Sequence, residues 1–151
     1  ERYGADGVTV CEEWKNFQNY ASWYEDNVVV GWAVDKDLID YKPKIYSPET
    51  CSFLPVTINS LFTGGFKTIV CKKPNGYTVQ LQKGEKCNNG NYPCKDQALD
   101  VYFIEKMKHI TEVVARTEGK VHPKVLDNIL NRSWVEEYIY YLSEQTNGRN
   151  K

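Results

Sequence analysis

The spacing of apolar residues predicts a helix, two strands and a second short helix in the first sixty residues. A stripe of apolar side chains at steps of three and four predicts a helix over residues 12–26; its members are Trp14, Phe17, Ala21 and Tyr24. The elements expected next are a β-branched strand at 28–34, a polar loop at 37–44, a strand at 50–54, and a helix or turn at 56–62 that Pro55 opens.

After Thr63-Gly64-Gly65 the pattern changes to hairpins and then to helices. Strands are expected at residues 67–72, 77–82 and 87–92, with Pro74-Asn75-Gly76 as the first turn. A long amphipathic helix is expected over residues 96–117, and Pro123 begins a shorter one. Ser133 and Glu136 fit a capping box for a last helix that ends near Ser143.

These elements predict an α+β fold in a chain of 151 residues, a length that suits one domain or two small ones. We place the boundary after Thr63, which gives modules at residues 1–63 and 64–151. Hydrophobic residues make up 41% and charged residues 26%, as in soluble globular proteins. No apolar run approaches the ~20 residues of a membrane span, so we expect no membrane association.

The charge distribution is more informative than the net charge of −1. Residues 1–64 hold ten acids and five bases, whereas residues 65–95 hold six lysines and one acid. The basic block is either a solvated sheet face or a surface that contacts DNA phosphates. Acids beside DNA make sense where some of them hold a divalent cation.

The five cysteines form no CxxC pair, and their odd number does not suit a disulfide framework. We expect reduced thiols and a cytoplasmic protein, although the loop between Cys87 and Cys94 would let that pair meet. The spacing gives no support for a structural zinc.

The first module resembles the metal-binding core of bacteriophage HNH homing endonucleases. The matching words are Tyr3-Gly4, Gly7-Val8, Val10-Cys11-Glu12-Glu13-Trp14, Phe17, Trp23-Tyr24, Gly31-Trp32, Val34-Asp35-Lys36-Asp37, Ile45-Tyr46-Ser47-Pro48-Glu49-Thr50-Cys51 and Ile58-Asn59-Ser60-Leu61. Their order and spacing are more specific than any single word. The resemblance implies a ββα-metal module, a phage-encoded protein of the bacterial cytoplasm, and hydrolysis of phosphodiester bonds in double-stranded DNA.

By this resemblance Asp35 and Asn59 are the protein ligands of one Mg²⁺ or Mn²⁺. Oxygen ligands suit such a hard cation, which keeps several waters. Each residue also has a plainer interpretation, as a surface acid and a polar helix residue.

Position 36 departs from the better-known HNH enzymes, which place a histidine there as the general base. Lys36 is protonated at neutral pH and is a donor rather than a base. We therefore expect Lys36 to stabilise the phosphate or the leaving group, while Asp37 or a metal-bound water handles the proton. The alternative is that this chain has lost catalysis and kept binding. The only histidines are His109, expected on the polar side of the long helix, and His122, expected to cap a helix.

The second module resembles the AP2 DNA-binding fold, a three-stranded antiparallel sheet with one long helix. The residues that carry this likeness are Gly76–Gly84 (GYTVQLQKG), Tyr92 and Gln97-Ala98-Leu99. In that family the sheet lies in the major groove, which is wide enough for a β-ribbon. The candidate DNA contacts are Lys67, Lys72, Lys73, Tyr77, Gln80, Gln82, Lys83 and Lys86, with Lys on phosphates and Gln80 or Gln82 on base edges.

Three functional hypotheses follow. The first is a metal-dependent DNA endonuclease with an AP2-like targeting module. The second is a DNA-binding protein of the same fold that does not cleave and acts as a regulator or inhibitor. The third is a structural or partner-binding protein that uses Tyr138, Tyr140 and Tyr141 of the last helix as an interface.

Overall fold

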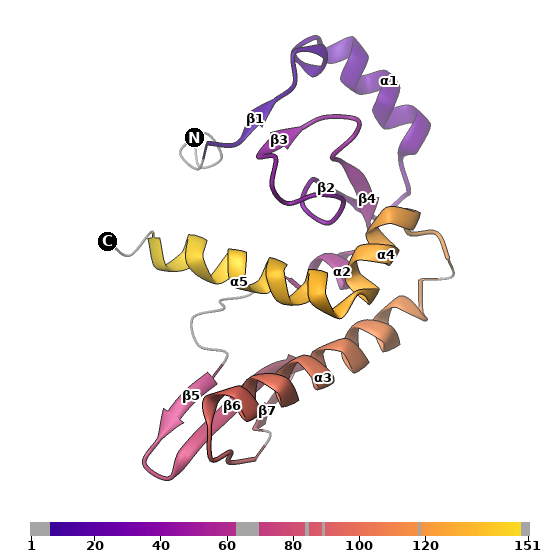
Figure 1. The fold of residues 1–151 in the computed structure, drawn as a ribbon. Coiled ribbons are helices and arrows are strands. Elements are labelled where there is room, and N and C mark those ends of the chain that lie inside the picture. The colour runs from indigo at the N-terminus through magenta and orange to yellow at the C-terminus, as the bar shows by residue number, and fades with distance from the viewer. Residues whose placement is uncertain (1–6, 63–69, 84, 89, 118, 149–151) are drawn as a thin grey trace.

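The computed structural model describes residues 7–62, 70–83, 85–88, 90–117 and 119–148. The fold is mixed α+β, as expected, and its strands form small sheets. Figure 1 shows three tiers: the N-terminal helix and short strands, a central tier containing α5, and a long helix with a sheet.

The N-terminal tier holds one helix and two strand pairs. Strand β1 (Thr9–Val10) pairs in parallel with β3 (Ile45–Tyr46), and β2 (Ala33–Asp35) pairs antiparallel with β4 (Ser52–Leu54). The predicted helix at 12–26 is split into the 3-10 turn η2 (Glu13–Lys15) and α1 (Phe17–Asn27). The split occurs because Asn16 is extended and its side chain accepts the N–H of Gln18, which begins a new helix.

Helix α2 (Val56–Asn59) follows β4 directly and packs against the long helix α3 (Lys95–Val114). The apolar stripe predicted α3 to within three residues. On α3 lies a sheet in which β6 (Gly76–Lys83) pairs antiparallel with β5 (Val70–Lys73) and with β7 (Glu85–Asn88). The first two strands and the helix expected after residue 63 are therefore confirmed as elements, with Lys67 outside the described residues. The third strand, expected at residues 87–92, lies at Glu85–Asn88 instead, and Tyr92 forms an isolated bridge with Tyr77.

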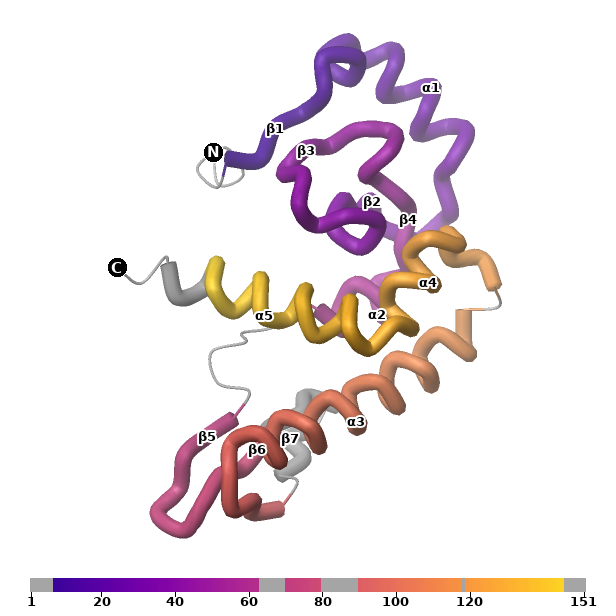
Figure 2. Tube along the Cα trace, viewed as in Figure 1, coloured from indigo at the N-terminus to yellow at the C-terminus, as the bar shows by residue number. Residues whose placement is uncertain are grey.

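Two C-terminal helices lie between the other tiers. Helix α4 (Pro123–Leu130) contacts α3, and α5 (Arg132–Gly148) contacts both. Figure 2 shows α5 crossing between the β2–β4 pair and α3. The predicted capping box is wrong. The side chain that caps α5 belongs to Asn131 rather than to Ser133, and it accepts the backbone N–H of Trp134.

One buried cluster runs through all three tiers. It includes Leu38 and Ile58 from the first sixty residues, Ile110 from α3, and Val125 and Ile139 from the C-terminal helices. The division into modules at residue 63 stays a prediction. None of the helices in the described part of the chain is both long enough and apolar enough to span a membrane.

Candidate functional site

Asp35 lies at the end of β2, where the sequence predicted an acid at a strand tip. Its Oδ2 accepts the backbone N–H groups of Asp37 at 2.8 Å and Leu38 at 2.9 Å. Such a turn is stable because one carboxylate oxygen satisfies two backbone donors. The other oxygen makes no hydrogen bond with the described residues, so it is left for an external ligand.

The environment of Asp35 disfavours its negative charge. Burial raises the pKa of its carboxyl, and the charge of Asp37 raises it further. The two backbone hydrogen bonds and the charge of Lys36 act in the opposite direction but do not cancel the burial. A cation beside Asp35 would favour the ionised carboxylate.

Lys36 is buried, with 8% of its surface exposed, and is ion-paired to its neighbour. Its Nζ donates to Asp37 Oδ1 and lies 5.9 Å from the centroid of the Tyr46 ring. The ammonium therefore neutralises Asp37, a contact that the sequence interpretation did not include. Lys36 could contact a phosphate only if its ammonium were shared between Asp37 and the phosphate.

Asn59 is the last residue of α2, half-buried, and its side chain has no hydrogen-bond partner in the described ranges. In the β2–β4 ladder Asp35 pairs with Ser52, whereas α2 begins beyond Leu54 at the other end. Strand β4 is roughly 7 Å long and α2 roughly 6 Å, so Asn59 reaches Asp35 only if α2 runs back along the pair. Convergence of Asp35 and Asn59 stays a prediction.

Tyr138 and Tyr141 of α5, which the sequence suggests as part of a partner interface, lie near Asp35 and Asp37. The pKa of Tyr138 is raised by burial and by the charges of Asp37 and Asp35, and that of Tyr141 by burial and by Asp37. Tyr138 is 4% exposed and so is not part of an outer surface, whereas Tyr140 is 46% exposed.

The spacing of aromatic residues in α5 could have predicted that this helix packs on the loop that follows β2. Trp134, Tyr138 and Tyr141 share one helix face at steps of four and three, and all three contact the ring of Tyr41.

Cys51 adds a thiol to the same region. Burial raises its pKa, and the charge of Asp35 contributes to the rise. Cys11, Cys51, Cys71 and Cys94 are free thiols, and the side chain of Cys87 is outside the described residues.

The predicted DNA contacts are only partly described. Lys72 and Lys73 are exposed on β5. Tyr77 is half-buried against the core and exchanges two backbone hydrogen bonds with Tyr92, so its ring has a packing role.

Lys67 lies outside the described residues, as do the side chains of Gln80, Gln82, Lys83 and Lys86. For these strand positions the structure gives register alone: Gln80 pairs with Asn88, Gln82 with Lys86 and Lys83 with Glu85.

The histidines lie where the sequence placed them. His122 caps α4 through Nδ1, which accepts the N–H of Lys124 at 3.2 Å. His109 is on α3, 3.9 Å from Glu112. In the described ranges no three His, Cys, Asp or Glu side chains gather as a metal site. A cation at Asp35 would therefore need few protein ligands and more from water or phosphate, as Mg²⁺ tolerates.

Comparison of the chain with protein-family models, with curated proteins and with solved structures finds no match in any of the three.

Proposed function

We propose that this chain is a metal-dependent DNA endonuclease of the HNH homing type. The observation that carries the proposal is the half-buried Asp35, whose raised pKa and free carboxylate oxygen suit a cation. It lies on an antiparallel strand pair that α2 follows directly. The ββα-metal and AP2-like identities of the two halves, and the bacteriophage origin, belong to this proposal and rest on the sequence resemblance.

A single Mg²⁺ or Mn²⁺ would be held by Asp35 and by the amide oxygen of Asn59. Such an ion supplies positive charge at the scissile phosphate and a more acidic bound water. Lys36 donates to Asp37 and fixes its carboxylate in position. Asp37 receives the proton of the attacking water on the oxygen that Lys36 does not occupy. Tyr138 and Tyr141 limit the access of bulk water from the α5 side.

The basic strands supply affinity for DNA. Lys72 and Lys73 are exposed, as phosphate contacts require, and the wider lysine block of residues 65–95 supports a role as a DNA-backbone surface. Base reading by Gln80 or Gln82 is part of the same proposal.

A second candidate is a DNA-binding protein that does not cleave. It is favoured by the Lys36–Asp37 ion pair, which ties up both of the proposed catalytic side chains. Its DNA-binding surface would be unchanged, and only the hydrolysis would be missing.

Plasmid nicking in Mg²⁺ or Mn²⁺ tests the proposal with the variant Asp35→Asn. An asparagine oxygen still accepts the N–H groups of Asp37 and Leu38, so the turn is kept while the charge is lost. We expect nicking to slow by about 100-fold or more. The matched control is Asp40→Asn, since Asp40 Oδ1 accepts the N–H of Lys42 in a similar turn of the same loop.

Binding of the same proteins to duplex DNA is measured at several salt concentrations. A linear fall of log affinity with log salt in both variants reports phosphate contacts that do not depend on Asp35. Wild-type binding without nicking supports the second candidate. Equal nicking by wild type and Asp35→Asn overturns the site assignment.

A further inference from the structure

Two adjoining cavities lie between the chain that follows α1 and the C-terminal end of α3, and β4 lines the smaller one. Their volumes are about 420 Å³ and 160 Å³, and both are lined by Val29, Trp32 and Lys120. Because they share these three residues the cavities lie side by side, and we call the pair the recess. Its size falls in the range of small-molecule sites in proteins, ≈ 300–1,000 Å³.

The smaller cavity contains an unusual polar group. Ser52 lines it and is 6% exposed, and its Oγ has no hydrogen-bond partner among the described residues. Buried hydroxyls are nearly always paired, because leaving one unpaired loses the hydrogen bonds that it made to water. An unpaired hydroxyl in a cavity wall is available to a polar atom of a ligand.

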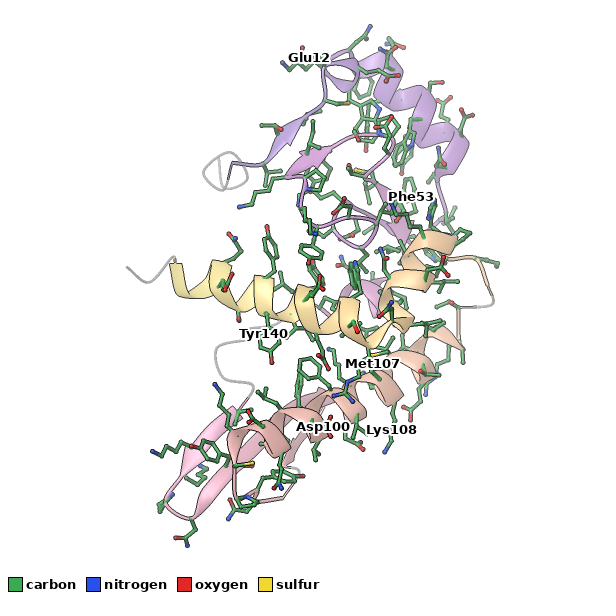
Figure 3. All side chains as sticks on the ribbon, in the orientation of Figure 1. Glu12, Phe53, Asp100, Met107, Lys108 and Tyr140 are labelled. Atoms are coloured by element: carbon green, nitrogen blue, oxygen red, sulfur yellow. The ribbon has the colours of Figure 1, made fainter. Side chains whose placement is uncertain are left out.

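Aromatic rings form another part of the wall. Trp23 and Phe53 stack with ring centroids 5.6 Å apart and an interplanar angle of 18°. Both line the smaller cavity, and Trp32 lines both cavities. Figure 3 shows Phe53 where the first tier meets α4. Flat indole and phenyl surfaces favour a planar ring as the ligand.

The rim of the recess carries two cations and an imidazole. Arg116 lines the larger cavity, Lys120 both, and His122 the smaller one, and all three are exposed. His122 Nδ1 accepts the N–H of Lys124, so a neutral imidazole carries its proton on Nε2 and can donate it. Guanidinium, ammonium and imidazole groups together suit a phosphate.

We propose that this recess binds a nucleoside monophosphate. The base lies against the tryptophans, the phosphate lies at Arg116 and Lys120, and Ser52 Oγ pairs with a polar atom of the ligand. A purely apolar ligand would leave Ser52 unpaired, and a bare anion would not use the aromatic wall. The ligand is a free nucleotide or one unstacked nucleotide of a DNA strand. Cys51 and Ser52 line the recess beside the Asp35 strand, but none of the proposed nuclease residues does, namely Asp35, Lys36, Asp37 and Asn59. The inference therefore does not depend on nuclease activity.

The test follows the indole N–H signals of ¹⁵N-labelled protein by NMR, with assignments from single Trp→Phe variants. Trp23 and Trp32 line the recess, whereas Trp134 packs against Tyr41 and serves as an internal control. With dAMP or the single strand dA5 we expect saturable shifts of Trp23 and Trp32 but not of Trp134. Deoxyadenosine and inorganic phosphate should each bind roughly tenfold more weakly, since each lacks one half of the contacts. Binding of dAMP indicates a free nucleotide, and binding of dA5 alone indicates a strand. Absence of shifts with both overturns the proposal.

Two variants assign the contacts. Ser52→Ala removes a hydroxyl that no described residue pairs with, so the fold is kept. Arg116→Gln removes one rim cation. Each should weaken nucleotide binding roughly tenfold. Lys124→Gln, which removes an exposed cation outside the recess, should not change it. Wild-type affinity in both Ser52→Ala and Arg116→Gln contradicts the proposal. The titration is repeated without divalent metal in Asp35→Asn, where unchanged binding separates this site from the nuclease site.

Discussion

Lys106 is a buried charged residue at the junction of α2 and α3. Its Nζ donates to the backbone carbonyl of Leu61 and lies 5.3 Å from the centroid of the Phe62 ring. Burial lowers the pKa of this amine to about 8, from 10.5. Its charge therefore costs stability at neutral pH, because the ammonium loses its water and gains only a carbonyl and a ring.

This lowered pKa predicts a rise of stability with pH. Between pH 8 and 10.5 the unfolded chain holds more protons at position 106 than the folded chain, so the free energy of unfolding rises with pH. The full contribution is roughly 3 kcal/mol, from a shift of about 2.5 pKa units at 1.36 kcal/mol each. Urea denaturation at pH 7.5 and 9.5 should show wild type gaining about 2 kcal/mol relative to Lys106→Met.

The control for this measurement is Lys108→Met, since Lys108 is exposed on the same helix and pairs with Glu105 at 2.7 Å. The free energy of unfolding of Lys108→Met should differ from that of wild type by the same amount at both pH values. A Lys106→Met protein that gains as much stability with pH as wild type would show that this amine titrates normally.

The residue types around Asp35 were enough to predict part of the candidate site from the sequence. The apolar run before Asp35 ends in an acid, which correctly indicated a strand tip. The partner of Lys36 was not predictable, since choosing Asp37 over a phosphate depends on how deeply the ammonium is buried. The Tyr46 ring lies beside the Lys36 ammonium from ten residues away, and no local pattern encodes that contact.

At the scale of elements, the turn between β5 and β6 depends on Gly76. This glycine has φ +138°, a conformation that side chains disfavour, and a Cβ there would overlap the backbone carbonyl oxygen of Tyr92. The same carbonyl accepts the N–H of Tyr77 at 2.8 Å. Sequence analysis identified the turn from Asn75-Gly76 but not the close approach of Tyr92, sixteen residues away.

We expect Gly76→Ala to cost about 3 kcal/mol in the free energy of unfolding, from backbone strain together with the displaced Tyr77–Tyr92 bridge. Gly31→Ala is the control, because Gly31 has φ +83° but nothing within 4 Å of its Cβ position. It should cost about 1 kcal/mol, through strain alone. Urea denaturation measures both, and equal costs would mean that the Tyr92 contact does not matter.

Element types were predicted better than element lengths. The bounds of α3 agree with the prediction from its apolar stripe, because the sheet and the other helices pack against it. The strand expected at residues 28–34 is largely wrong, because β2 is Ala33–Asp35 and overlaps it at only two residues. Residues 30–31 form a turn, and β4 pairs only with the residues after it. Val30 is 95% exposed and pairs with no residue of β4, so its β-branched side chain is not enough to form a strand there.

At the scale of the whole molecule, the C-terminal helices hold the loop that carries the acids. Asn128 of α4 donates from Nδ2 to the carbonyls of Leu38 and Ile39, both at 2.9 Å, across about ninety residues of sequence. Tyr41 in the same loop packs against Trp134 and Tyr138. These long-range contacts could not be predicted from periodicity, which describes one element at a time. They also mean that the first sixty residues do not form the candidate site alone.

This dependence predicts the effect of Asn128→Ala. Two backbone carbonyls lose their donor, so the free energy of unfolding should fall by about 2 kcal/mol, with Asn131→Ala as a control that removes only a helix cap worth about 1 kcal/mol. Because one buried cluster joins all three tiers, tryptophan fluorescence and far-UV circular dichroism should report coincident urea transitions in both proteins and in wild type. Two separated transitions would instead favour modules at residues 1–63 and 64–151 that unfold independently. In that case Asn128→Ala should shift only the transition of the first module, since the carbonyls it leaves unpaired belong to that module.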